Sequence, residues 1–205
     1  MCCQETKRIG ILGGSFDPVH NGHLELAKCA REEARLDEVW FLPARRQPFK
    51  LQAGQTGIAD RLSMLSLALE DQMGFSVCRL EADSDRISYT YQTMEELSKA
   101  HPDKTFFFIM GADSFMDFPK WRFPERIAKT ASLLVAAREE FGRARLEEQE
   151  CFIKTRFPVI VQFLMLSKIP VSSSQIREQI RIGRSTEKLL NPRVLDYIRE
   201  HGLYR

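Results

Sequence analysis

The chain has 205 residues, of which 43% are hydrophobic and 28% are charged, the composition of a soluble globular protein with room for a sizeable core. A net charge of +2 does not indicate a nucleic-acid or membrane partner, and no stretch approaches the roughly 18 apolar residues of a membrane span. The first ten residues lack the apolar core of a signal peptide, so we expect a cytoplasmic protein. The five cysteines are odd in number and include no Cys-x-x-Cys pair, which argues against disulfides and against a cysteine zinc cluster.

Short apolar runs alternate with longer segments of helical period along the chain. The apolar runs predict strands over 8–12, 38–42, 75–80, 105–110, 132–137 and 158–165. Apolar residues at helical spacing predict helices from Asn21 onward and over 58–70, 90–100 and about 173–182. A last helix is predicted between Asn191, its N-cap, and Gly202, with Pro192 at its first position. The charge-rich residues 139–157 predict either a helix or a mobile excursion.

This alternation, with strands apolar on both faces, predicts an α/β fold. We expect a Rossmann-like, doubly wound, mostly parallel sheet with helices on both faces, forming one domain over 1–205 with a small helical part at about 172–205. Ligands of such sheets bind beyond the carboxyl ends of the strands. That rule directs attention to three junctions, at 13–23, 111–121 and 170–177.

The first junction, GGSFDPVHNGH, follows the first strand directly. Gly13 and Gly14 permit a sharp turn and a close approach to a ligand, although they match neither the dinucleotide fingerprint nor the P-loop. Pro18 fixes the turn, and Asp17 is suited to accept hydrogen bonds from nearby backbone N–H groups.

Two histidines stand three residues apart at the start of the following helix. His20 and His23 share a face there, where free N–H groups and the helix dipole favour anions, and Gly22 leaves room for a phosphate against the backbone. Two imidazoles at an anion site can donate hydrogen bonds to phosphate oxygens. A zinc site is one alternative, but it requires a further ligand. A purely structural role is another, in which His20 is a capping residue and His23 is a half-buried helix residue.

The last junction contains Ser172, Ser173 and Ser174 before an apolar-periodic helix, with Arg177 one turn inside. One serine is suited to be the N-cap. Hydroxyls, free N–H groups and a guanidinium converge here, and the first acidic residue is Glu178, so the junction also suits a polyphosphate.

These two stretches carry a family resemblance. GGSFDPVHNGH resembles the (H/T)-x-G-H signature of the nucleotidyltransferase superfamily, and it is most similar to that of the bacterial nicotinate-nucleotide adenylyltransferases. VSSSQIR resembles the second signature, I-S-S-T-x-x-R, with Val171 for Ile and Ser174 for Thr. The resemblance implies that His20 and His23 bind ATP phosphates without a covalent intermediate, and that Ser173 and Arg177 bind the β- and γ-phosphates. The implied ATP site comprises Gly13, Gly14, Ser15, Phe16, His20, Gly22, His23, Gly111, Asp113, Ser172, Ser173, Ile176 and Arg177, of which His20, His23 and Arg177 would be catalytic.

The middle of the chain extends the resemblance to the second substrate. RISYTYQT is similar to the S-Y-T-x-x-T stretch that recognises the pyridine carboxylate, although Thr90 also suits a helix N-cap. GADSFMDFPKW is similar to the G-x-D-S…W run, which implies ribose or magnesium-water contacts for Asp113 and ring stacking for Trp121, a residue that a core would also accommodate. QPFK keeps Lys50 as a phosphate-binding cation but has Phe49 where the family commonly has His. The implied acceptor site comprises Lys50, Ser88, Tyr89, Thr90, Asp113 and Trp121.

The reaction that the resemblance implies is adenylyl transfer from ATP to nicotinate mononucleotide, giving nicotinate adenine dinucleotide and pyrophosphate in NAD biosynthesis. Mg²⁺ would be bound through the ATP phosphates and water, with no direct protein ligand. The implied partners are these small molecules, without nucleic acid or membrane, and the sequence leaves monomer and homo-oligomer both open. Nicotinamide mononucleotide and phosphopantetheine are alternative acceptors. A non-catalytic nucleotide sensor is a further alternative, which would predict damaged phosphate motifs.

Overall fold

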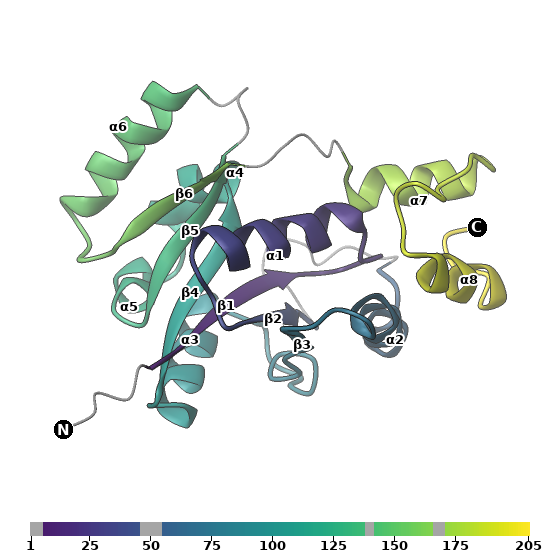
Figure 1. The fold of residues 1–205 in the computed structure, drawn as a ribbon, viewed down its shortest axis with the longest axis horizontal. Helices are drawn as coiled ribbons and strands as arrows, with labels where there is room; N and C mark the ends of the chain where they lie inside the picture. Colours follow the sequence, from purple (N-terminus) through teal and green to yellow (C-terminus); the bar gives the residue numbers. More distant parts are fainter. Residues whose placement is uncertain (1–5, 46–54, 138–141, 166–170) are drawn as a thin grey trace.

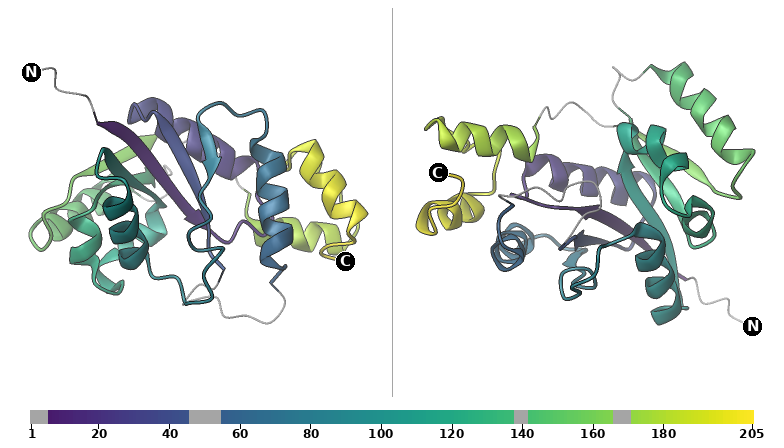
Figure 2. Two further views of the ribbon diagram at one scale, coloured as in Figure 1. Left: turned by 90° about the horizontal axis from the view of Figure 1, so that it is seen from below. Right: turned by 180° about the vertical axis from the view of Figure 1, so that it is seen from behind.

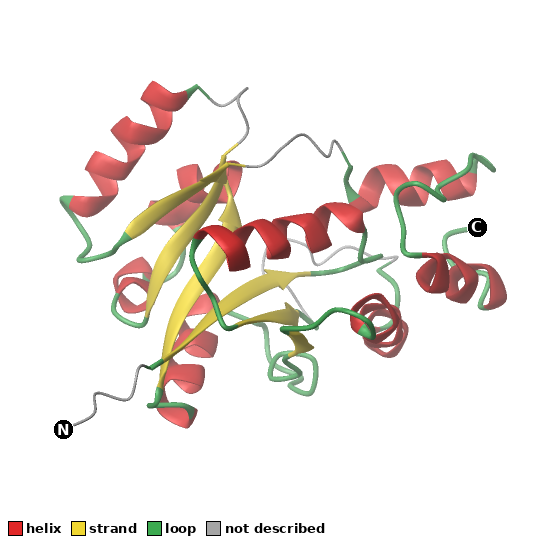
Figure 3. Cartoon of the chain, in the orientation of Figure 1, coloured by secondary structure: helices red, strands yellow, loops and turns green. Residues whose placement is uncertain are grey.

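A computed structural model describes residues 6–45, 55–137, 142–165 and 171–205. Six strands form one sheet in the order β3-β2-β1-β4-β5-β6, and every neighbouring pair is parallel (Figure 1, Figure 3). The strands are β1 (Lys7–Gly14), β2 (Glu38–Pro43), β3 (Phe75–Val77), β4 (Lys104–Gly111), β5 (Ala131–Ala137) and β6 (Val161–Met165). This is the strand order of a doubly wound, Rossmann-like sheet, and it confirms the predicted fold class.

Helices cover both faces of the sheet. The helices are α1 (Asn21–Glu33), α2 (Ile58–Leu69), α3 (Thr90–Ala100), α4 (Ala112–Asp117), the 3₁₀ turn η1 (Phe118–Lys120), α5 (Pro124–Ala128), α6 (Arg143–Lys154), α7 (Ser173–Arg181) and α8 (Pro192–Glu200). In β4, Phe107 and Ile109 pack into one core cluster with α1, α2, α7 and α8, whereas Phe106 and Phe108 pack into the other with α3, α4, α5 and α6. Successive side chains therefore serve opposite faces, as the pleat requires.

The two last helices pack beyond the ends of β1 and β2, side by side in both views of Figure 2. Ser172 caps α7 by accepting a hydrogen bond from the Gln175 N–H, and Asn191 caps α8 by accepting one from the Arg193 N–H. Leu190 and Val194 lie in the same buried cluster as Leu24 of α1. The region 172–205 thus shares a core with the first half of the chain.

Element boundaries differ from the sequence prediction by three residues at two strands and by one or two residues at others. Gly13 and Gly14, which were predicted to follow the first strand, are the last two residues of β1. β3 ends at Val77, not at 80, because the chain turns where the Asp83 N–H bonds to the Arg79 carbonyl. β6 begins at Val161, not at 158, because Pro158 has no N–H and the Val159 N–H bonds locally to the Phe157 carbonyl. The short helices α4, η1 and α5 were not predicted, since they lack the length that makes helical periodicity visible.

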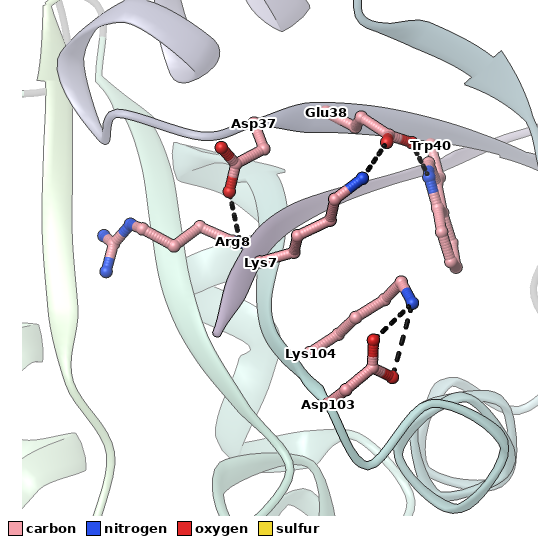
Figure 4. Close-up of polar contacts among 7 residues, drawn as sticks. All are labelled: Lys7, Arg8, Asp37, Glu38, Trp40, Asp103 and Lys104. Carbon is pink, nitrogen blue, oxygen red and sulfur yellow. Dashed lines mark hydrogen bonds and ion pairs between the residues drawn. The ribbon is translucent and has the colours of Figure 1, made fainter. Parts of the chain in front are cut away.

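Polar contacts join the amino-terminal ends of β1 and β2, and Lys104 at the start of β4 pairs with its neighbour Asp103 (Figure 4). The Arg8 N–H donates to Asp37 Oδ2 at 2.7 Å, Lys7 Nζ pairs with Glu38 Oε1 at 3.4 Å, and Trp40 Nε1 donates to Glu38 Oε2 at 2.9 Å. The contacts of Lys7 and Arg8 hold β1 to the start of β2, at the edge of the sheet opposite to the three predicted junctions. No helix within the described ranges is both long and apolar enough to cross a membrane.

Candidate active site

The loop between β1 and α1 brings the two histidines together. His20 is the N-cap of α1, with φ −146° and ψ 168°, and His23 lies three residues later in the first turn. Their rings stack with centroids 3.7 Å apart and an interplanar angle of 26°. The pair therefore stands at the amino end of a 13-residue helix that has no acidic residue in its first turn, a position that favours anions.

The tautomer of His23 follows from one contact. The His20 backbone N–H donates to His23 Nδ1 at 3.3 Å, so this nitrogen acts as an acceptor and the proton of a neutral ring belongs on Nε2. The edge of the Phe16 ring packs on the other side, with centroids 5.0 Å apart. Both contacts fix the plane of the His23 ring and leave Nε2 as its donor.

His20 is buried, with 6% of its surface exposed, and its Nδ1 has no hydrogen-bond partner in the described part of the chain. Burial lowers the pKa of His20 from 6.5 to about 4, so the ring is neutral at pH 7. A buried polar atom without a partner lowers stability, and a bound ligand would relieve this. The zinc alternative finds no support, because the described residues contain no group of three or more His, Cys, Asp or Glu side chains placed to hold a metal ion.

The buried His20 ring predicts an acid-sensitive free energy of unfolding. Above about pH 6.5 the ring is neutral in both states, but as the pH falls to about 4 only the unfolded chain gains the proton. We expect the free energy of unfolding to fall by up to about 3 kcal/mol over this range on account of His20 alone. Urea titrations at pH 7 and pH 4.5 would measure this. Between the two pH values the free energy of unfolding should fall less for His20→Asn than for wild type, and it should fall as much as in wild type for the exposed control His201→Asn.

The second predicted junction lies against the first. Ser173 Oγ donates to the Pro18 carbonyl at 2.9 Å, and Arg177 Nη1 donates to the Asp17 carbonyl at 2.7 Å. Arg177 Nη2 also donates to Ser174 Oγ at 3.3 Å. Residues more than 150 positions apart therefore meet at one loop, and the Arg177 guanidinium retains further N–H donors.

Three residues of the predicted ATP site are closely packed by the protein. A Cβ on Gly22 would lie 2.9 Å from Val171 Cγ1 and 3.1 Å from the His20 ring, so this glycine permits close packing of these two side chains against the backbone. Phe16 and Ile176 are 1% and 0% exposed, within the core. Their side chains cannot line a pocket, so only the backbone of these residues is available to a nucleotide.

The β4 side of the site lies at the same edge of the sheet. β1 and β4 are paired neighbours, so Gly13 and Gly14 end beside Gly111, where a Cβ would meet no atom within 4 Å. Asp113 follows in the first turn of α4 and is exposed. Its carboxylate is accessible to a ligand at this edge.

The predicted acceptor residues form a second group. Tyr89, not Thr90, is the N-cap of α3, and Thr90 is the first helical residue. The Arg122 guanidinium lies 4.7 Å from the Tyr89 ring centroid, which joins this helix start to the segment carrying Trp121. Trp121 is half-buried, and it meets the ring of Phe108 edge-on at 5.9 Å. Lys50 and Phe49 lie outside the described residues.

Three polar side chains that the sequence analysis did not single out support the predicted ATP and acceptor residues. Glu81 is 8% exposed and accepts hydrogen bonds from Thr93 Oγ1 at 2.6 Å and from the Ser88 side chain. Tyr204 OH donates to Asp17 Oδ1 at 2.6 Å, and burial raises the pKa of this phenol. Arg61, 1% exposed, donates to three backbone carbonyls. Of these three residues only Arg61 could have been found from the sequence, because it is a cation on the apolar face of a predicted helix.

Known proteins with this fold and chain length supply a comparison. Residues 11–179 match the cytidylyltransferase-like family model. The chain is 37% identical over 198 residues to a probable nicotinate-nucleotide adenylyltransferase of Bacillus cytotoxicus, covering 97% of this chain and 98% of that one. It is 39% identical over 199 residues to one of Streptococcus pyogenes serotype M1, covering 97% and 89%. A solved structure of the Plasmodium falciparum nicotinic acid mononucleotide adenylyltransferase complexed with NaAD superimposes with a TM-score of 0.77 at 22% identity, covering 97% of each chain.

The sequence likeness extends over nearly the whole of the chain and of its relatives, and the range that matches the family model includes both signature stretches. The chain belongs to the nicotinate-nucleotide adenylyltransferases, within the cytidylyltransferase-like family.

Proposed function

We propose that the protein transfers the adenylyl group of ATP to nicotinate mononucleotide, forming nicotinate adenine dinucleotide and pyrophosphate for NAD biosynthesis. The observation that carries this proposal is the meeting of the stacked pair His20 and His23 with Ser173 and Arg177 at one loop beyond β1. This arrangement places two imidazoles and a guanidinium at a helix start, where their N–H donors suit a triphosphate, and Ser173 ties the second junction to the same loop.

The reaction is a displacement at phosphorus. An oxygen of the acceptor phosphate attacks the α-phosphorus of ATP and forms a new P–O bond, while the bond to the bridging α–β oxygen breaks and pyrophosphate leaves with the electron pair. The acceptor phosphate is an anion at neutral pH, so no general base is required. The protein contributes alignment of the two substrates and stabilisation of developing negative charge. We assign the second task to His23 Nε2, His20 and the guanidinium of Arg177.

The residues fit a magnesium ion carried by the nucleotide. Mg²⁺ retains several waters and usually binds through substrate phosphates and one or two carboxylates. The exposed carboxylate of Asp113 at the end of β4 suits contact with such waters or with ribose hydroxyls. The ion, when bound, would neutralise charge on the phosphates and on the departing pyrophosphate.

The test is direct. Purified protein is incubated with ATP and Mg²⁺ and with nicotinate mononucleotide, nicotinamide mononucleotide or phosphopantetheine in turn, and the products are weighed by mass spectrometry. We expect nicotinate adenine dinucleotide as the main product. If nicotinamide mononucleotide or phosphopantetheine is converted faster, that compound is the substrate in place of nicotinate mononucleotide. If the protein binds ATP but forms no product with any acceptor, a non-catalytic nucleotide sensor is favoured.

Trp121 is expected to serve the acceptor. Trp121→Ala should raise the KM for nicotinate mononucleotide about tenfold through loss of ring stacking, with kcat and the KM for ATP little changed. Trp40→Ala is the matched control, because Trp40 is also half-buried and meets two rings edge-on, those of Phe106 at 6.0 Å and His101 at 5.2 Å. If both variants had the same KM for nicotinate mononucleotide, Trp121 would have a packing role only.

A further inference from the structure

Arg61 occupies a position where an apolar residue is expected. It lies in the first turn of α2 on the face that also carries the buried Leu62 and Leu65, and only 1% of its surface is exposed. Burial lowers the pKa of its guanidinium and the nearby Asp17 carboxylate raises it, so the group stays charged. A buried cation is unfavourable unless its hydrogen bonds are satisfied, so its partners indicate why it is there.

All the partners are backbone carbonyls at the carboxyl edge of the sheet. Nη1 donates to Ser15 O at 2.7 Å and to Ala44 O at 2.8 Å, and Nε donates to Thr56 O at 3.0 Å. Ser15 belongs to the loop after β1, Ala44 follows β2, and Thr56 precedes α2. One guanidinium therefore joins three chain segments, a task for which its rigid fork of donors is suited.

The bond to Ser15 sets the orientation of one peptide group. Because the peptide unit is planar and trans, a Ser15 carbonyl that points to the buried guanidinium directs the Phe16 N–H to the opposite side. Phe16 has φ 48°, a left-handed conformation that is unfavourable for a residue with a Cβ and must be held by its surroundings. The carbonyls of Asp17 and Pro18 are likewise held, by Arg177 and Ser173. The loop thus turns the carbonyls of Ser15, Asp17 and Pro18 toward protein donors, and the Phe16 N–H points away from Arg61.

We propose that Arg61 is a positioning residue, which holds the Ser15–Phe16 peptide so that the β1–α1 loop presents an N–H donor and the fixed His23 ring to the ATP phosphates. Arg61 touches no substrate itself and acts through the loop. This inference rests on the proposed function in taking ATP as the ligand of that loop, but it does not depend on which acceptor is used.

The test compares Arg61→Lys with Arg8→Lys. Lysine keeps the charge, but its single ammonium cannot reach three carbonyls in a fork. Arg8 is the matched control, since its guanidinium donates to the Ala34 carbonyl at 3.0 Å and lies over the Phe107 ring. Arg8 stands at the start of β1, at the opposite edge of the sheet (Figure 4). Both variants lose an arginine bond to a backbone carbonyl, so both are expected to melt at a lower temperature than wild type.

Only Arg61→Lys is expected to alter the ATP site. Measured well below its melting temperature, it should lower kcat/KM for ATP about 10- to 100-fold and weaken binding of α,β-methylene ATP in calorimetry, with the acceptor KM within twofold of wild type. If this variant is too unstable, Arg61→Gln, which buries no charge, should show the same pattern. An Arg61 variant that is folded and binds the analogue as wild type does, or that weakens ATP and acceptor alike, would overturn the proposal. The binding measurement needs no turnover, so failure of the proposed reaction would be seen separately.

Discussion

His23→Ala is expected to lower kcat about 10²- to 10³-fold while the KM for the acceptor stays within a few-fold of wild type. The proton of the neutral ring is assigned to Nε2 because Nδ1 accepts the His20 N–H, so the variant loses one oriented donor to the phosphates. That bond strengthens as negative charge develops, and its loss therefore acts mainly on the transition state.

Steady-state kinetics with each substrate varied in turn would measure the effect. His101→Ala is the control, because this histidine lies at the other edge of the sheet against Trp40. His23→Gln should recover part of the rate if a donor is what matters, since its amide can occupy part of the same position. A His23→Ala enzyme with near-normal turnover would remove this ring from the chemistry.

The fold was predictable because its central strands are apolar on both faces. Runs such as TFFFIM cannot be amphipathic helices or half-exposed strands, and only a covered parallel sheet accommodates several of them. The ends of β3 and β6 were not predictable from periodicity, because a turn held between Arg79 and Asp83 and the missing amide of Pro158 decide them.

The meeting of the first and last junctions was predictable for the same reason. Parallel strands deliver their carboxyl ends to one edge, so signatures after different strands must converge there. The supporting groups were not predictable, because Arg61 meets Ser15 across 46 positions and Tyr204 meets Asp17 across 187. Such contacts depend on side-chain placement in the folded chain, as does the burial that removes Phe16 and Ile176 from any pocket wall.

Arg177→Met is expected to lower activity about as much as His23→Ala does, but through the use of ATP and not of the acceptor. The variant removes a cation that both contacts the β1–α1 loop, through the Asp17 carbonyl, and retains donors for the β- and γ-phosphates in our assignment. We expect kcat/KM for ATP to fall about 10³-fold, and the acceptor KM to change little. Loss of the bond to Asp17 should also lower the free energy of unfolding by about 1.5–3 kcal/mol.

Arg181→Met on the same helix provides the control. Arg181 lies one turn later, with 63% of its side chain exposed, and pairs with Glu178 at 2.7 Å, so its loss should change neither stability nor kinetics by much. Kinetics with ATP varied and urea unfolding of both variants would separate the two effects of Arg177. Because a stability loss alone leaves kcat/KM intact below the melting transition, an Arg177→Met enzyme that is less stable but uses ATP normally would make this arginine a loop anchor and nothing more.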